Sequence, residues 1–145
     1  MLITRETDYA LRMLRVLLDE EKPSAAEMAE TELIPMQFAY QILRKLSAGE
    51  LVQVSRGAAG GCRLSCDLRG VSLYDLMAVM GEHDVLCACM EPGYDCRWQS
   101  EHGKCDIHCQ LTVLQRKQDE ALRAVSLHRL LTGEAIQKEE AAQQT

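Results

Sequence analysis

Apolar residues step by three or four positions along the first stretch of the chain. This period predicts an amphipathic helix over residues 5–20, with Thr4 as its N-cap. The face expected to point inward consists of Ala10, Met13, Leu14 and Leu17.

Two shorter helices are predicted next. Ser24 and Glu27 have the spacing of a capping box, so a second helix begins there and ends near Thr31. Pro35 suits the first turn of a third helix, and Gly49 stands where its C-cap is expected. The expected inner faces are Ala25, Met28 and Ala29 in the second helix and Phe38, Ile42, Leu43 and Leu46 in the third.

A change of pattern follows the third helix. Residues 51–55 and 62–65 are typical of short strands, and the glycine-rich residues 56–61 between them predict a turn. A hairpin placed after two short helices and a longer first helix indicates a winged helix-turn-helix, a mainly α fold with a small β wing.

A long helix is expected from Asp106 to Ala124. Its stripe resembles that of a short coiled coil, although a buried core helix explains the same pattern. The stripe consists of Leu111, Leu114, Gln118, Ala121 and Val125.

Charge is distributed unevenly. The net charge of the chain is −6, but residues 35–69 carry five basic and two acidic side chains and are the only basic third. Phosphates meet a local patch and not the global charge, so the helix and hairpin in this third favour nucleic-acid binding.

Five of the seven cysteines fall in residues 87–109, which show neither helical period nor strand alternation. Such a loop buries too little apolar surface to order itself, and clustered thiolates select zinc, copper(I) or an iron-sulfur cluster. Disulfides are the competing explanation, but the chain shows no secretory leader and we expect a cytoplasmic protein. Cys62 and Cys66 are interpreted as ordinary thiols, and His83 and His128 as structural.

Several motifs together resemble one family. TDYALR, SAAEMAE, IPMQFAYQILRKLSAGELV, SRGAAGGCRLS, VSLYDLMAVM and the cysteine cluster ending in CDIH are similar, in order and spacing, to the Rrf2 family of bacterial winged-helix regulators. The likeness is to its iron-sulfur members of the IscR, NsrR and RirA type and extends over residues 1–131. It implies a homodimeric transcription regulator or repressor that binds a palindromic operator in double-stranded DNA.

The DNA contacts are expected on the outward face of the third helix, which would lie in the major groove. Gln37 and Gln41 suit adenine, Tyr40 suits a thymine methyl, and Arg44 and Lys45 suit phosphates. The full expected set is Met36, Gln37, Tyr40, Gln41, Arg44 and Lys45 on the helix, with Arg56 on the wing. The resemblance implies that Arg56 enters the minor groove, but Ala58, Ala59 and Cys62 depart from the wing residues common in the family.

The resemblance also implies a ligand set for a 2Fe-2S or 4Fe-4S cluster. The family's three cysteines correspond to Cys89, Cys96 and Cys105, separated here by six and eight residues. The fourth ligand is either His108 or Asp8 of the other subunit, and TDYALR slightly favours Asp8. Cys87 and Cys109 are further candidates that the family pattern does not require.

The expected organisation has four parts. Residues 1–80 form the winged domain, 81–109 the cluster loop, 110–131 the dimerisation region and 132–145 a polar tail. The cluster would sense nitric oxide, iron or redox state. The alternative is a DNA-binding regulator that is stabilised by zinc or senses thiol oxidation at Cys87 and Cys89. No catalytic motif and no apolar run of membrane length is present, so we expect neither an enzyme nor a membrane protein.

Overall fold

The computed structural model describes residues 2–82 and 85–134 and is mainly helical with one small antiparallel sheet. The polar tail from residue 135 onward and His83 lie outside the described residues. In chain order the elements are α1 (Arg5–Asp19), α2 (Ala25–Thr31), α3 (Met36–Ala48), β1 (Val52–Ser55), β2 (Gly61–Leu64), the 3-10 turn η1 (Leu68–Gly70), α4 (Leu73–Met80), the 3-10 turn η2 (Ala88–Met90), α5 (Arg97–His102), α6 (Asp106–Arg123) and α7 (Leu127–Thr132).

The helix-turn-helix predicted from capping and periodicity is confirmed. The Thr4 side chain caps α1, and Ser24 and Glu27 form both hydrogen bonds of a capping box at the start of α2. Arg15 of α1 makes two bonds to the carboxylate of Glu32, the nearly buried residue that follows α2. This pair fixes α1 against the turn between α2 and α3.

One inner-face prediction for α3 is wrong. Phe38 is 37% exposed, and the fully buried residue beside it is Ala39. The buried face of the helix therefore consists of Ala39, Ile42, Leu43 and Leu46, turned slightly from the predicted face. Phe38 packs instead at the rim, with its ring tilted against that of Tyr9 on α1.

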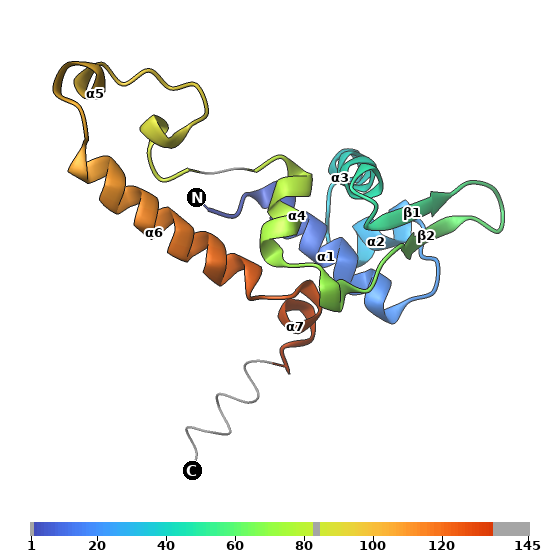
Figure 1. Ribbon diagram of the computed structural model, residues 1–145. Coiled ribbons are helices and arrows are strands. Elements are labelled where there is room, and N and C mark those ends of the chain that lie inside the picture. Colours follow the sequence, from blue (N-terminus) through green and yellow to red (C-terminus); the bar gives the residue numbers. More distant parts are fainter. Residues whose placement is uncertain (1, 83–84, 135–145) are drawn as a thin grey trace, which may run out of the picture.

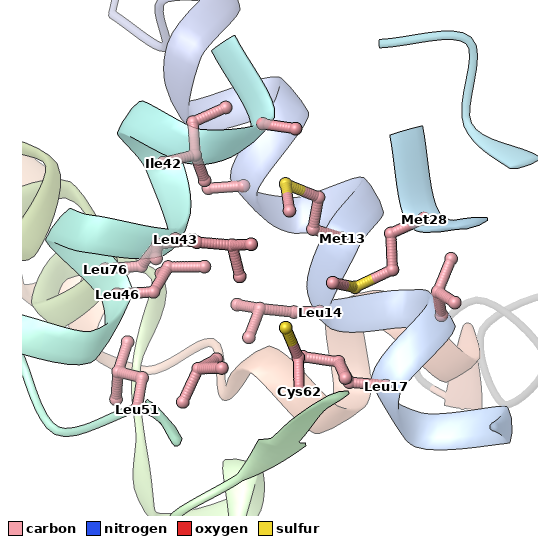
Figure 2. Packing of buried hydrophobic residues seen from close by; sticks show 14 of the residues in the cluster. Met13, Leu14, Leu17, Met28, Ile42, Leu43, Leu46, Leu51, Cys62 and Leu76 are labelled. Carbon is pink, nitrogen blue, oxygen red and sulfur yellow. The ribbon is translucent and has the colours of Figure 1, made fainter. Parts of the chain in front are cut away.

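The core lies where α1, α3, α4 and the first residues of the sheet meet (Figure 2). Met13, Leu14, Met28, Ile42, Leu46 and Leu76 are among its fully buried side chains. Gly49 follows α3 as predicted, but for a reason of space: a Cβ atom there would lie 2.7 Å from both methyl groups of Val79 on α4. The glycine allows α3 and α4 to pack closely.

The hairpin expected after α3 is present. β1 pairs with β2 in antiparallel register, with Val52 opposite Leu64 and Ser55 opposite Gly61. Its tip projects from the domain (Figure 1), as a wing does. Cys62 faces inward and is buried, which raises the pKa of its thiol and removes it from chemistry at the surface.

The C-terminal half consists of a loop and a long helix (Figure 1). The loop after α4 extends to the far end of α6, and α6 returns along α4 to reach α7 beside η1. The predicted long helix is confirmed. The sequence prediction lacks α4 and the shorter elements η1, η2, α5 and α7, and the shorter ones have too few residues to show a period.

Candidate functional site

The outward face of α3 presents a row of exposed side chains. Met36, Gln37, Tyr40, Gln41 and Arg44 are all exposed, with Tyr40 at 57%. Ala39, Ile42, Leu43 and Leu46 occupy the opposite, buried face. Amide, phenol and guanidinium groups on one side of a helix are the groups that read base edges and hold phosphates.

A groove of about 1290 Å³ separates α3 from the wing. Tyr40, Gln41 and Arg44 line one wall, and Ser55, Arg56 and Gly57 line the other. The same groove is therefore bounded by side chains from both elements that were predicted to contact DNA.

The wing turn is closed by glycines on both sides of Ala58-Ala59. Gly57 has a φ of +96°, and a Cβ at Gly60 would lie 2.3 Å from the carbonyl oxygen of Ser55. The departures from the family's wing residues thus leave a tight turn, and Arg56 stays exposed at its start. Behind the tip, Arg63 donates to the side-chain oxygen of Gln53 across the two strands.

Lys45 differs from the other α3 residues predicted to contact DNA. Its ammonium group lies 2.9 Å from the carboxylate of Glu6 on α1 and 3.0 Å from the carbonyl oxygen of Met80, the last residue of α4. The side chain is only half exposed and is directed into the protein. Lys45 therefore joins three helices in this structure, and it also lines the groove between α3 and the wing.

All seven cysteines are free thiols. In the loop, the sulfur of Cys89 lies 3.5 Å from that of Cys87 and 3.3 Å from Nδ1 of His108 on α6. Cys105 caps α6, because its sulfur accepts a hydrogen bond from the backbone N–H of His108 at 3.5 Å. Cys89 and the His108 imidazole are thus in contact near the start of α6, the helix that Cys105 caps.

The two neighbouring thiols ionise differently. The pKa of Cys87 is lowered, chiefly by a hydrogen bond from the backbone N–H of Cys89 and next by one from the Cys89 thiol. The pKa of Cys89 is raised, first by its hydrogen bond to Cys87, then by desolvation and by the charges of Cys87, Cys96 and Cys105. Cys87 is consequently the first of the two to become a thiolate, and the other ligand candidates are near enough to act on Cys89.

The remaining predicted ligands are placed less closely. Cys96 is half buried and precedes α5, and its side chain does not cap that helix. Cys109 lies one turn into α6 and is also half buried. Asp8 is on α1, where its carboxylate is 3.0 Å from Nε of Arg12 and both side chains are close to half exposed.

The donor set of the loop fits a thiolate-bound metal group. Five thiols and an imidazole, all partly accessible, are the ligand chemistry of iron-sulfur and zinc sites. Across residues 2–82 and 85–134, no three such side chains stand together at metal-binding geometry. Cys96 must therefore approach Cys89 and Cys105 for a metal group to be held.

The long helix α6 presents an apolar outer surface. None of its 18 residues, all of them described, is fully buried. Leu122 is half buried against the domain and the Arg123 guanidinium lies 3.6 Å over the ring of Tyr74, while Ile107 and Leu114 are 72% and 53% exposed. Of the stripe predicted for this helix, Leu114 and Ala121 are exposed, and the other three residues are half buried.

These features define a winged helix-turn-helix protein of the class that binds DNA. A family model described as "Rrf2: Iron-dependent Transcriptional regulator" matches residues 3–133. The chain belongs to the Rrf2 family, whose members are transcription regulators and not enzymes.

Individual relatives are more distant. Protein aau3 of Rhizobium meliloti (strain 1021) is 31% identical over 99 residues, which span 66% of this chain and 64% of that protein. The chain thus spans less than two thirds of this curated relative's length. Along the described residues, no helix has the length and apolarity needed to cross a membrane.

Two solved structures have the same fold. The IscR protein of T. potens superposes with a TM-score of 0.66 at 18% identity, covering 92% of this chain and 88% of that one. CymR of B. subtilis, the global cysteine regulator, superposes with a TM-score of 0.65 at 19% identity, covering 91% of this chain and 97% of that one. At these identities the likeness shows the fold alone, so cluster sensing and thiol sensing both stay open.

Two features of the site have no signal in the sequence. The contact of Lys45 with Glu6 and Met80 joins residues far apart in the chain. The approach of His108 to Cys89 depends on how the loop returns to α6. The CDIH motif singled out His108, but no local pattern indicates which cysteine it meets.

Proposed function

We propose that this protein is a homodimeric transcription regulator whose affinity for a palindromic operator is controlled by an iron-sulfur cluster that senses nitric oxide, iron or redox state. The observation that carries the proposal is the contact of Cys89 with the His108 imidazole in the first turn of α6, the helix that Cys105 caps. That helix also packs on α4 of the winged domain, so ligands and DNA-binding elements share one structural unit.

The proposed ligands are Cys89, Cys96 and Cys105, with His108 as the fourth. The 3.3 Å separation of His108 from Cys89 supports the histidine over Asp8, whose carboxylate is already paired with Arg12. In the alternative arrangement, Asp8 is donated across the dimer and must leave Arg12. When bound, a cluster with one non-thiolate ligand supplies a site at which nitric oxide or oxygen reacts more readily than at a fully thiolate-bound one.

The proposed DNA contacts are Met36, Gln37, Tyr40, Gln41 and Arg44 on α3 and Arg56 on the wing. Their common exposure and the groove between the two elements support this set. Lys45 lines the same groove and stays a proposed phosphate contact, for which its ammonium must leave Glu6 and the carbonyl oxygen of Met80. Two copies of the chain, paired through α6, would present two such surfaces to the two half-sites of a palindrome.

The loop is joined to α6 at its start as well as at its end. The backbone N–H of Leu86 donates to the side-chain oxygen of Gln115 at 2.8 Å. On the other side, Glu82 at the end of α4 accepts from the Thr4 hydroxyl before α1. A change in the loop on metal binding thus acts on contacts that position α1, α4 and α6, which is how we expect it to alter the spacing of the two winged domains.

A second candidate function is a thiol-sensing or zinc-stabilised DNA-binding regulator. The 3.5 Å separation of the Cys87 and Cys89 sulfurs favours it, as does the fold shared with a regulator named for cysteine. A structural zinc would use four of the cysteine and histidine side chains of the same loop.

The test is an optical spectrum of protein purified without oxygen, with iron, sulfide and zinc assayed on the same sample. We expect visible absorption with matched iron and sulfide, strongly reduced in His108→Ala and retained in Asp8→Ala. Loss of the cluster only in Asp8→Ala would identify the carboxylate as the ligand. A colourless protein with zinc would instead establish the second candidate.

A further inference from the structure

The thiols of Cys87 and Cys89 lie side by side although the family's ligand pattern requires only one of them. Their sulfurs are 3.5 Å apart and hydrogen bonded. Ala88 between them begins the turn η2, which is closed by a hydrogen bond from the Met90 N–H to the Cys87 carbonyl oxygen at 2.9 Å. The helical conformation of Ala88 shortens the backbone span, so the two sulfurs can approach without a movement of distant segments.

Cys89 has a second neighbour on its other side. Nδ1 of His108 is 3.3 Å from the same sulfur. Cys89 therefore stands between two arrangements, one with His108 and Cys105 and one with Cys87. A sulfur that is bonded covalently to Cys87 can no longer act as a thiolate ligand, so the two arrangements exclude each other.

We propose that Cys87 forms a disulfide with Cys89 when a peroxide is present and thereby withdraws one ligand from the metal-binding loop. One of the two sulfurs, as a thiolate, attacks an oxygen of hydrogen peroxide. The O–O bond breaks, and that cysteine becomes a sulfenic acid while hydroxide leaves. The second sulfur then attacks the sulfenic sulfur, the S–O bond breaks and a second hydroxide leaves. Both hydroxides are protonated by the two thiol protons, so two thiols and one hydrogen peroxide give one disulfide and two waters.

The consequence for regulation rests on the proposed function. An oxidised loop would hold the protein in its metal-free form until a thiol reductant restores Cys89. Both residues are partly exposed, and a disulfide that spans a single residue is strained, so reduction is expected to be easy. Oxidation of Cys87 and Cys89 is therefore expected to be reversible.

The test uses the metal-free full chain treated with stoichiometric hydrogen peroxide, then alkylated and cleaved before aspartates. This cleavage places Cys87 and Cys89 in residues 84–94 and Cys96 and Cys105 in residues 95–105. We expect fragment 84–94 to become lighter by two hydrogen atoms and to resist alkylation. A link between the two fragments, or alkylation of both thiols in fragment 84–94, would overturn the inference.

Cys87→Ser and the matched control Cys109→Ser complete the test, because both remove a half-buried thiol outside the proposed ligand set, Cys87 in the loop and Cys109 on α6. After peroxide and removal of excess oxidant, wild type and Cys109→Ser are expected to take up iron and sulfide only once a reductant is added. Reduced Cys87→Ser should load as reduced wild type does. If it fails while Cys109→Ser loads, Cys87 is a ligand and the inference is wrong. If no reduced sample loads, the proposed function fails, and the fragment masses still decide the disulfide.

Discussion

At the scale of single residues, position along a helix decides which α3 side chains are free to meet DNA. A period of 3.6 residues separates Gln41 and Arg44 from the buried face correctly. It does not foresee that Phe38 stays at the rim, or that Lys45 is bound by a carboxylate from α1 and a carbonyl from α4. These two outcomes depend on the shape and charge of neighbouring helices, which a single-helix pattern does not contain.

Substitutions on α3 should separate base reading from phosphate binding. Gln41→Ala is expected to weaken binding to a selected operator by about 1–3 kcal/mol, because a bidentate contact to one base is lost. Arg44→Ala should weaken binding to all duplexes alike and reduce the salt slope by about one. Fluorescence anisotropy over a range of salt concentrations measures both effects.

Arg69→Ala is the control for these variants. It removes the same charge from an exposed side chain on η1, outside the groove between α3 and the wing. Its affinity should match that of the wild type. If Arg44→Ala and Arg69→Ala lose affinity equally, the assignment of the binding face is wrong.

At the scale of elements, local signals predicted most of the winged domain. The caps at Thr4 and Ser24 and the glycine-rich turn at residues 56–61 act over a few residues, so the sequence contains the whole signal. The cysteine loop differs, because its arrangement depends on contacts such as Cys89 with His108 that span many positions. The family likeness indicates which residues are ligands, but only the structure gives the distances between them.

Gly49 tests the packing of α3 on α4. In Gly49→Ala the new methyl group would lie 2.7 Å from Val79, a stiff β-branched side chain, so a loss of about 1–3 kcal/mol in the free energy of unfolding is expected. Gly70→Ala is the control, since a Cβ there meets nothing within 4 Å. Urea unfolding measures the free energy of unfolding of both variants. Equal stabilities would contradict the close approach of α3 to α4.

The capping box of α4 predicts a pH dependence. The Ser72 side-chain and backbone hydrogen bonds lower the pKa of Asp75. A depressed pKa in the folded state means that Asp75 contributes stability above its ordinary pKa and loses it as the pH falls through the lowered folded value. Asp75→Asn should therefore be less stable than the wild type at neutral pH, and the difference should shrink in acid.

Urea titrations at several pH values measure this difference. The chain carries other carboxylates, so the comparison of the two proteins is informative and the slope of either alone is not. A difference that grows toward acid pH would contradict the assigned direction.

At the scale of the whole molecule, the uncovered face of α6 and the cysteine loop at its start belong to one proposed assembly. Leu114 is 53% exposed on that face, and Leu114→Asp is expected to convert a dimer to monomers, because a carboxylate would be buried between apolar surfaces. Sedimentation velocity measures the change. Thr112→Asp is the control, since two residues turn the helix by about 200° and place position 112 on the opposite side. Dissociation by both variants, or by neither, would contradict pairing through this face.

The central claim is that occupancy of the cysteine loop controls DNA affinity. The most direct measurement is the Kd of one preparation for one operator, selected from random duplexes, before and after its cluster is removed without oxygen, at the same salt concentration. We expect the two forms to differ by at least about fivefold, which corresponds to a coupling of about 1 kcal/mol, and Arg69→Ala, outside both sites, to leave the ratio unchanged. Identical affinities of the loaded and metal-free forms would contradict the account.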